Sequence, residues 1–545
     1  MDLWDALTSG ASAGHGTLHC WEGDGFSSTP WSQVSREALD STRGLRGAGV
    51  EPGAVVATIL TNTPATVRGI LGVWMAGGVL ASLPVPARGM TAASYLGQIE
   101  RICERIEPQV TLLDDNVLGM LPEELRERFR ARSWSSVAGS GAIPPSPPGA
   151  ESPAFIQFSS GSTSEPKGCV LRTRAIGEQL EMIMAMLQAV PGEETAVSWL
   201  PLSHDMGIFG NLLTPWAFDE DLVLSTPERF MMSPRTWFAD VAESGATVTC
   251  GTNGALAMAA RSQRGELPRP LRLHTVILGA ERLQWPTLSH ALEVFGPSGL
   301  RDTHLMPAYG LAEAALAVTA TPRDEAPRFL AVDGEALGQG EVAVATDPGP
   351  GSATMVASGV PCRGVELHGV DSEGLNELEV SSPCLADGYF EDDSQTRERF
   401  AEGRLRTRDL AFVRDGWLYP VGRTDDLISI GGRKVYACEI EAGVDALEGV
   451  RRGCSTVVET SRNGRQQLTL LMELGDDAAE QIPLVAREAA AVAMRRAAVT
   501  IDACVFLPKG ALPKTPSGKI QRYRCREMLD RSSFEPIEHV ELAEA

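Results

Sequence analysis

The sequence lacks any closely spaced group of metal-binding or disulfide-forming residues. Its ten cysteines are scattered, with no CxxC pair and no Cys/His cluster at zinc-binding spacing. This pattern argues against a structural zinc site and against a disulfide scaffold, and it is typical of reduced thiols in a cytoplasmic protein. The first residues contain no basic segment followed by an apolar one, so no secretory signal is predicted.

Positive charge is also scarce. The chain has 48 Lys and Arg against 71 Asp and Glu, which gives a formal net charge of −23. Nucleic acids and anionic membranes are bound by surfaces that neutralise phosphates, so neither is expected as a partner. An anionic small ligand remains compatible with this charge, because a pocket sets its own local field.

A long hydrophobic segment without interruptions is missing as well. No charged residue occurs between Arg68 and Arg88, a span long enough to raise the question of a membrane helix. However, this span contains Gly77, Gly78 and Pro84, which break a helix. We therefore expect a buried helix, a turn and a strand, and no membrane insertion.

What the sequence does contain is a long alternation of strand-like and helix-like segments. The length of 545 residues and the hydrophobic share of 43% fit a globular protein of several domains. Strands are predicted at 54–60, 109–113, 155–158, 196–200, 247–250 and 275–278, and helices at 65–76, 93–106, 173–189 and 234–243. This alternation predicts an α/β fold with parallel sheets covered by helices on both faces.

The pattern changes after residue 423. A strand-like run at 427–430 meets two glycines, and a helix at 439–447, strands at 455–459 and 468–472 and a helix at 485–498 follow. These segments predict a small α+β unit. We expect an N-terminal domain of residues 1–423, a hinge of residues 424–427 that includes Asp425, and a C-terminal domain of residues 428–545.

The segment FIQFSSGSTSEPKG, residues 155–168, predicts an anion-binding loop. An apolar strand runs into a stretch of small residues that ends in Lys167 and Gly168. Small residues let backbone N–H groups turn inward around an anion. The hydroxyl groups of the loop belong to Ser159, Ser160, Ser162 and Thr163. Together with the Lys167 charge they suit a triphosphate, although the GxxxxGK[ST] pattern is absent. The alternative is a flexible surface loop.

A second motif, MPAYGLAEAALAV at 306–318, carries a single acid, Glu313. We expect a Tyr-Gly turn followed by a helix of small residues. An acid at the start of an apolar helix either caps the helix or holds Mg²⁺ against phosphate oxygens. The residues themselves leave both alternatives open.

The third motif, residues 405–435, predicts two strands joined by the turn Asp415-Gly416. Asp409 and Arg423 flank this pair of strands. An aspartate at a strand end can accept hydrogen bonds from both hydroxyls of a ribose, and the alternative is an ion pair with a neighbouring arginine.

The fourth motif, LPKTPSGKIQRYRCR at 512–526, places Lys519 after a Ser-Gly turn. A loop that presents one ammonium group suits charge stabilisation that is assembled when a site closes. The alternative is a basic tail, which would fit Arg522, Arg524 and Arg526 better than Lys519.

These four motifs, in this order, resemble the adenylate-forming superfamily of acyl-CoA synthetases, luciferases and peptide-synthetase adenylation domains. The resemblance covers about residues 31–529, and the stretches 198–215, 307–319 and 328–361 resemble the fatty acyl-AMP ligases. It implies a large N-terminal domain of two packed sheet layers with helices plus a distorted β-barrel. It also implies a small, mobile α+β C-terminal lid.

The resemblance assigns roles to individual residues. ATP phosphates would be held by Ser159, Ser160, Gly161, Ser162, Thr163, Lys167 and Gly168, with Mg²⁺ on Glu313 and Thr163. Adenine and ribose would be held by Gly279, Ala280, Glu281, Ala308, Tyr309, Gly310, Asp409 and Arg423. The acyl pocket would include His204, Asn253, Gly254 and Met306. Lys519 would contact the α-phosphate and the attacking carboxylate, and it forms the catalytic set with Arg423 and Glu313.

The implied reaction is the ATP-dependent conversion of a carboxylic acid into acyl-AMP and pyrophosphate. A fatty or aryl acid is expected, because no residue of the sequence demands a substrate ammonium group. The adenylate would pass to a thiol, and the expected acceptor is the phosphopantetheine of an acyl carrier protein. Free CoA is the alternative acceptor, and a non-thiol nucleophile is a second alternative.

Three positions depart from the pattern of acyl-AMP ligases. Ser164 stands where most of the superfamily has glycine, and Ser203 replaces an aromatic residue before His-Asp-Met-Gly. Asp425 and residues 431–434 are closer to acyl-CoA synthetases, which leaves the acceptor open. Two groups of arginines either dock a carrier protein or form surface ion pairs: Arg522, Arg524 and Arg526, and Arg451 and Arg452.

Overall fold

The computed structural model describes residues 1–542 except 87–89, 138–142, 159–165, 346–351, 425–426, 431–432, 463–464, 476–478, 498 and 515–519. Several residues with predicted roles lie outside the described part of the chain: Ser159, Ser160, Gly161, Ser162, Thr163, Ser164, Asp425 and Lys519. Their roles stay predictions.

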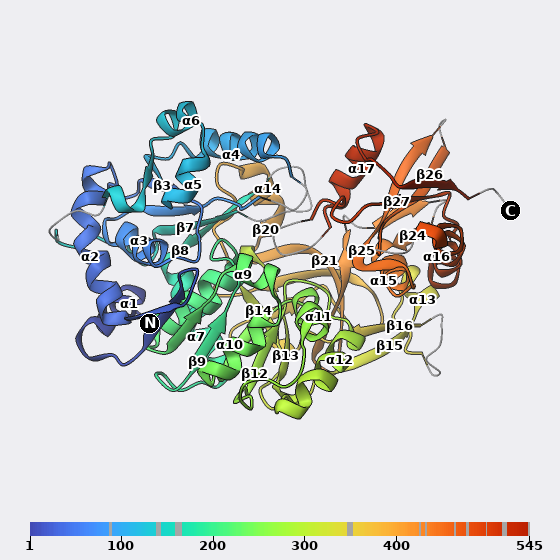
Figure 1. The fold of residues 1–545 in the computed structure, drawn as a ribbon, viewed down its shortest axis with the longest axis horizontal. Helices are drawn as coiled ribbons and strands as arrows, with labels where there is room; N and C mark the ends of the chain where they lie inside the picture. Colours follow the sequence, from blue (N-terminus) through green and yellow to red (C-terminus); the bar gives the residue numbers. More distant parts are fainter. Residues whose placement is uncertain are drawn as a thin grey trace.

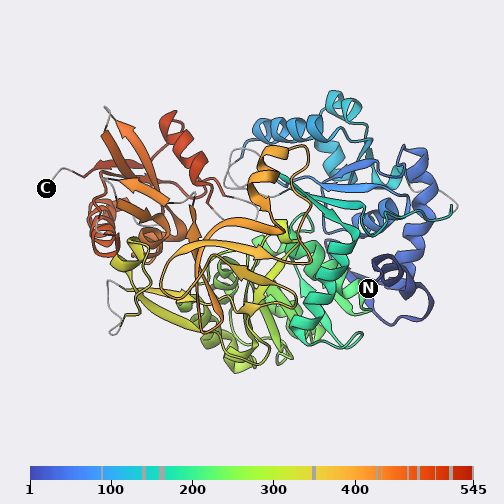
Figure 2. The same ribbon diagram turned by 180° about the vertical axis from the view of Figure 1, so that it is seen from behind.

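Two mostly parallel sheets form the large N-terminal part of the molecule (Figures 1 and 2). The six-stranded sheet has the order β6-β5-β3-β4-β7-β8 and is parallel except for β8. Its strands are β3 (Val55–Thr58), β4 (Val79–Ser82), β5 (Val110–Leu113), β6 (Ala131–Ser133), β7 (Pro153–Phe158) and β8 (Gly168–Arg172).

The nine-stranded sheet has the order β17-β14-β13-β12-β11-β9-β10-β1-β2, with parallel pairing from β13 to β1. Its strands are β1 (Thr17–Trp21), β2 (Phe26–Pro30), β9 (Thr195–Ser198), β10 (Asp221–Leu224), β11 (Val248–Gly251), β12 (Thr275–Leu278), β13 (Leu305–Gly310), β14 (Ala317–Ala320) and β17 (Val360–Pro361). Its central strands are almost fully buried, as expected for parallel strands with both faces covered.

Helices connect these strands and share their core. They are α1 (Leu3–Ala13), α2 (Trp31–Gly47), α3 (Pro64–Met75), α4 (Ala92–Ile106), α5 (Asp115–Met120), α6 (Glu123–Arg128), α7 (Thr173–Leu187), the π-helix η2 (Met206–Leu213), α8 (Thr214–Ala217), α9 (Pro227–Met232), α10 (Thr236–Ser244), α11 (Asn253–Ser262) and α12 (Trp285–Phe295). One buried cluster joins Leu80 of the six-stranded sheet to Leu222 of the nine-stranded sheet. The two packed sheet layers expected from the resemblance are therefore confirmed.

Antiparallel strands lie between this body and the C-terminal unit (Figure 1). They form one five-stranded sheet and one hairpin, with two short helices nearby. The strands and helices are β15 (Phe329–Asp333), β16 (Ser352–Val356), β18 (Glu366–His368), β19 (Asn376–Ser381), β20 (Phe400–Ala401), β21 (Arg404–Arg414), β22 (Trp417–Arg423), α13 (Gly334–Gly338) and α14 (Asp393–Arg399). This part corresponds to the expected distorted barrel.

The smaller C-terminal unit lies at one end of the molecule, in orange and red in Figure 1. Its elements are β23 (Leu427–Ile430), β24 (Arg433–Tyr436), α15 (Ala437–Val444), β25 (Val450–Arg462), β26 (Arg465–Leu474), α16 (Ile482–Ala497), β27 (Ala503–Leu507), α17 (Arg522–Asp530) and β28 (Glu538–Glu541). A buried cluster that runs from Ile428 to Phe506 draws only on this unit. The α/β class with a small C-terminal domain is confirmed, and the boundary and the hinge stay predictions.

The segment at 306–318 differs from the expected helix. Strand β13 extends to Gly310, a short 3₁₀ turn covers Ala312–Ala314, and β14 then pairs antiparallel with β13. The chain reverses at Ala315, whose φ is +61°. A Cβ on Gly310 would lie 1.9 Å from the Leu316 carbonyl oxygen, so only glycine fits there. The prediction of a helix was wrong because alanine-rich sequence does not reveal this tertiary pairing.

The uncharged span after Arg68 folds as α3, a turn and β4, which confirms the predicted helix, turn and strand. Among the described residues, no helix combines the length and the apolar character that crossing a membrane requires.

Candidate functional site

A cavity of about 670 Å³ runs along the nine-stranded sheet. Some of its lining residues come after the carboxyl ends of β9, β12 and β13. Others come just before β9 and β10 and therefore lie at the opposite edge of the sheet. Residues of the C-terminal unit, among them Arg522 and Tyr523, close one side. The cavity therefore joins a region between the two parts of the molecule to a chamber beside the sheet.

Lys167 marks one end of the cavity, where it lies with other cations. Its ammonium donates a hydrogen bond to Gln395 Oε1 at 2.6 Å and lies 5.2 Å from the centroid of the Tyr389 ring. Burial, and then the neighbouring guanidinium groups of Arg399 and Arg408, lower the pKa of Lys167. Cations held together against their mutual repulsion fit a ligand with several negative charges.

Glu313 faces the same end of the cavity. Tyr389 donates its hydroxyl hydrogen bond to Glu313 Oε1 at 2.7 Å, and Arg399 Nη2 lies 3.7 Å from the same oxygen. Arg399 is 4% exposed, and its Nη2 has no hydrogen-bond partner among the described residues. Glu313 therefore sits in a polar network that lines the cavity and is not a helix cap.

The donor set at Glu313 fits Mg²⁺ only in the company of phosphates. Across the described ranges, no group of three or more His, Cys, Asp or Glu side chains could hold a metal ion. Mg²⁺ is usually held by one or two carboxylates together with substrate phosphates. Glu313 supplies such a carboxylate, and the cations around Lys167 suit the phosphates.

Asp409 and Arg423 lie opposite each other on β21 and β22. Arg423 Nε is 3.2 Å from Asp409 Oδ1, and the Tyr309 hydroxyl donates a hydrogen bond to Asp409 Oδ2. The ion pair considered from sequence is thus present, and all three residues also line the cavity. Burial and the Asp409 charge raise the pKa of Tyr309, which keeps its hydroxyl a donor.

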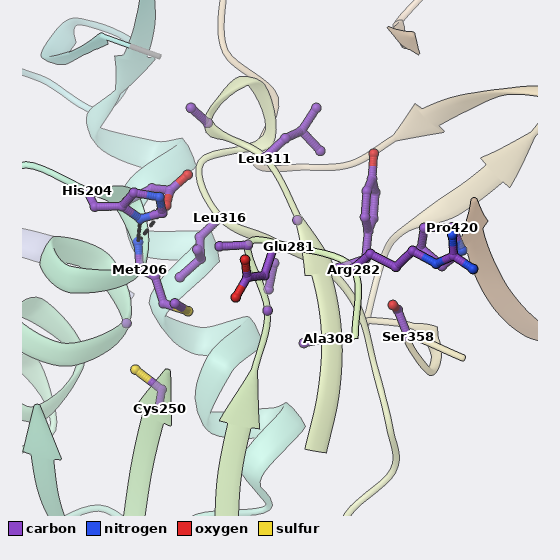
Figure 3. Close-up of a pocket in the computed structure, with 18 of the residues that line it drawn as sticks. His204, Met206, Cys250, Glu281, Arg282, Ala308, Leu311, Leu316, Ser358 and Pro420 are labelled. Carbon is purple, nitrogen blue, oxygen red and sulfur yellow. Dashed lines mark hydrogen bonds and ion pairs between the residues drawn. The ribbon is translucent and has the colours of Figure 1, made fainter. Parts of the chain in front are cut away.

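The predicted adenine-binding residues come together at the ends of β12 and β13. Gly279, Ala280, Glu281, Ala308, Tyr309 and Gly310 all line the cavity. A Cβ on Gly279 would lie 3.3 Å from the Ala308 carbonyl oxygen, so the two strand ends approach closely there. Ala280 has a φ of +67°, and the turn directs the following residues toward the cavity (Figure 3).

Only part of the predicted acyl pocket lines the cavity. His204 does, and its Nδ1 lies 2.6 Å from Asp205 Oδ1. Asn253, Gly254 and Met306 are not lining residues. Asn253 accepts a hydrogen bond from the Gln284 backbone, and the Gly254 backbone donates to Glu281, so these groups position the loop after β12. Met306 packs behind the wall, in a buried cluster with Ile183 and Leu187.

Sequence reasoning missed Tyr389, Arg399 and the pair Arg282–Glu439. Arg282 lines the cavity and contacts Glu439 of α15 at 2.7 Å, which links the N-terminal body to the C-terminal unit. Charge on a helix or a loop is common on any surface, so no spacing signal could have singled out these residues.

Two of the arginines considered for docking are engaged in ion pairs. Arg522 donates to both carboxylate oxygens of Glu441, and Arg451 Nη1 lies 3.2 Å from the buried Glu473. This pairing favours the ion-pair alternative for both residues.

The chain is similar to known proteins over most of its length. The model of the AMP-binding enzyme family matches residues 14–390. A 4-hydroxyphenylalkanoate adenylyltransferase of Mycobacterium marinum is 28% identical, over 94% of this chain and 87% of its own. The long-chain-fatty-acid–AMP ligase FadD26 of Mycobacterium bovis is 27% identical, over 94% of this chain and 93% of its own.

The fold has a counterpart among solved structures. A structure from a study of fatty acyl-adenylate ligases of E. coli and L. pneumophila matches with a TM-score of 0.89 and 23% identity. The match covers 98% of each chain, so the shared fold extends over both the N-terminal body and the C-terminal unit.

Proposed function

From the premise that this chain belongs to the AMP-binding enzyme family, we propose that it activates a fatty or aryl acid with ATP and passes the acyl group to a thiol. The enzyme is an acyl-adenylate synthetase, similar to the fatty acyl-AMP ligases. The class of acid, the acceptor and the residue roles below are the proposed part. Two of its relatives act, by their names, on an aryl alkanoate and on long-chain fatty acids, which supports both classes of acid.

One observation carries the proposal: a single cavity joins a cation-rich end to an apolar chamber. Lys167, Arg399 and Arg423 line the first, while Val248, Ile277 and Leu316 line the second. Cysteine and methionine side chains near Leu316 add to the apolar wall (Figure 3). A carboxylate that lies between the two ends has its chain in the chamber and its charged group beside the cations.

The reaction brings two anions together. A carboxylate oxygen forms a bond to the α-phosphorus of ATP, and the bond to the pyrophosphate oxygen breaks. Positioned positive charge offsets the repulsion, and such positioning supplies most of the catalysis in phosphoryl and nucleotidyl transfer. We assign this charge to Lys167 and Arg399 at the phosphates and to Lys519 at the reacting atoms. Asp409 is assigned to the ribose, with Arg423 and Tyr309 holding its carboxylate.

Mg²⁺ would be held by Glu313 beside the phosphates, with Thr163 as the second residue proposed from sequence. When bound, it would supply further neutralisation of the phosphate oxygens. Tyr389 and Arg399 orient the Glu313 carboxylate, since both contact Oε1.

For the acceptor we propose the phosphopantetheine of a carrier protein, with CoA as the alternative and a non-thiol nucleophile as the second one. The cavity reaches the C-terminal unit at Ser455, Arg522 and Tyr523, so an acceptor arm entering between the two parts has a route to the adenylate. A hinge at Asp425 would let this unit turn between the two half-reactions.

The test separates adenylation from transfer. We expect ATP–pyrophosphate exchange with fatty or aryl acids and weak exchange with α-amino acids. The preformed acyl-AMP should then be incubated with a phosphopantetheinylated carrier protein, with free CoA or with hydroxylamine, and the products analysed by mass spectrometry. Carrier acylation that is faster than CoA acylation supports the first acceptor, and the reverse supports CoA. An absence of exchange with every acid would contradict the proposed function itself.

A further inference from the structure

The far end of the acyl chamber carries a polar group that the reaction does not use. Glu220 precedes β10, is 3% exposed and lines the cavity. Its Oε1 is buried and, within the described part of the chain, has no hydrogen-bond partner. Buried polar atoms are nearly always partnered, so an unpartnered oxygen on a side chain that lines a cavity points to a ligand for that side chain.

Within the described part of the chain, the chamber that leads to Glu220 has mostly apolar walls. They include Ile183 and Leu187 of α7, Val248 of β11 and Ile277 of β12, which are apolar. The neighbouring acid Glu194 is already engaged, because it accepts hydrogen bonds from the Thr247 hydroxyl and, at 2.8 Å, lies next to His274 Nε2.

Burial and local charge decide the protonation state of the Glu220 carboxyl group. Burial, with Glu194 as a second cause, raises the pKa of Glu220 to about 8. At neutral pH the side chain is therefore mostly a neutral acid that both donates and accepts hydrogen bonds. Among the described residues, no cation contributes to this pKa shift. The strongest partners of the side chain are therefore a hydroxyl group, or an amine that takes its proton.

The position of Glu220 sets the length of the substrate. His204 and Gly279 lie beyond the carboxyl ends of β9 and β12, whereas Glu220 and Glu194 lie at the opposite edge of the same sheet. Four residues of strand separate the two edges, which is about 13 Å. A medium-length chain with its carboxylate near His204 would bring its far end to Glu220.

We propose that Glu220 binds a hydroxyl or amino group at the far end of the acyl chain, so that the preferred substrates are medium-length acids with a polar ω-terminus. This inference rests on the proposed function, because it concerns the acid that is adenylated. A plain alkyl chain would bury Glu220 against methyl groups and leave its hydrogen bonds unmade, and sites built for a hydrogen bond discriminate strongly against analogues that lack it.

The experiment compares decanoate, ω-hydroxydecanoate and ω-aminodecanoate in ATP–pyrophosphate exchange, with the octanoate and dodecanoate series as length controls. For the wild-type enzyme we expect a kcat/KM at least about tenfold higher for the hydroxy or the amino acid than for decanoate. A comparison of ω-hydroxydecanoate with ω-aminodecanoate shows whether the bound group is a hydroxyl or an amine. Titration calorimetry with the same acids and no ATP gives a readout that does not depend on turnover.

The variants Glu220→Leu and Glu220→Gln locate the effect. We expect Glu220→Leu to reverse the preference toward decanoate, and Glu220→Gln to keep part of it because an amide still forms hydrogen bonds. Glu193→Leu, at the exposed neighbour of Glu194, is the control and should change nothing.

Equal use of decanoate, ω-hydroxydecanoate and ω-aminodecanoate by the wild type, with no change in Glu220→Gln, overturns the inference and leaves the proposed function standing. A lack of exchange with every acid instead overturns the proposed function. If Glu220→Leu fails to fold, the substrate preferences of the wild type and of Glu220→Gln still decide whether Glu220 binds the far end of the acyl chain.

Discussion

The two ends of the cavity are built in opposite ways. At the phosphate end, Lys167, Glu313, Tyr389 and Arg399 contact one another, so each charge is held by a neighbour. At the far end, the two acids Glu194 and Glu220 stand in a largely apolar wall, and Oε1 of Glu220 has no partner among the described residues. One end of the cavity is thus built from a network of paired charges, and the other from few polar groups in an apolar wall.

The largest effect is expected from Lys519→Ala. Loss of one positioned charge at the reacting phosphate should lower the rate of adenylation by about 10²–10³. The measurement is ATP–pyrophosphate exchange, with Lys509→Ala as the matched control because Lys509 is an exposed lysine. Exchange close to wild type in a folded Lys519→Ala enzyme would contradict the assignment and leave Lys167 and Arg399 as the active cations.

Next comes Glu313→Gln, which should reduce exchange about a hundredfold, with partial recovery at high Mg²⁺. The amide keeps a carbonyl oxygen for the Tyr389 hydroxyl but loses the charge that the metal and Arg399 require. A Mg²⁺ titration of the rate, beside a thermal melt, checks this. A large fall in melting temperature with no response to Mg²⁺ would make the residue structural.

Arg399→Met should raise the KM and the dissociation constant for ATP by about tenfold, with less effect on kcat. The guanidinium is buried beside Glu313, and methionine preserves most of its volume. Arg397→Met, on the exposed side of the same helix α14, is the control. Calorimetric binding of ATP distinguishes the outcomes, since unchanged affinity would remove Arg399 from the phosphate network.

Stability and its dependence on pH should also distinguish the two ends of the cavity. The pKa of Glu220 is raised to about 8 in the folded chain, against about 4.3 in an unfolded one. The neutral acid is thus favoured by folding, and this contribution is complete below about pH 4.3 and is lost as the pH rises through 8. Glu220→Gln carries no such titration. The melting temperature of Glu220→Gln relative to that of the wild type should therefore rise with pH. A difference that stays constant with pH would show that the pKa of Glu220 is not raised in the folded chain.

Much of the fold was predictable from local pattern. The predicted strands match β3, β5, β7, β9, β11 and β12 to within about two residues, because buried parallel strands are short apolar runs between helices. The alanine-rich stretch around Glu313 was predicted wrongly. Its helical composition is overridden by the pairing of β14 with β13, which a single sequence does not display.

The candidate site shows the same contrast between what local sequence predicts and what tertiary packing decides. Residues in motifs, such as Lys167, Glu313 and Asp409, were found from sequence and lie together around one cavity. Asn253, Gly254 and Met306 were placed in the acyl pocket and instead lie behind its wall or support it. The cavity is lined instead by residues such as Cys250, Gly279 and Ala308, and only the packing of the chain decides which side chain faces inward.

By itself, the amino-acid sequence determined the α/β class, the order of the four motifs and the chemistry that they imply, because those depend on residue types within a few positions of one another. Only the tertiary structure decided which charges meet. Arg399 reaches Glu313, and Glu220 reaches the acyl chamber, across long separations in the chain. The physical reason is that burial and unmade hydrogen bonds are properties of packed neighbours, and these neighbours come from elements that folding alone brings together.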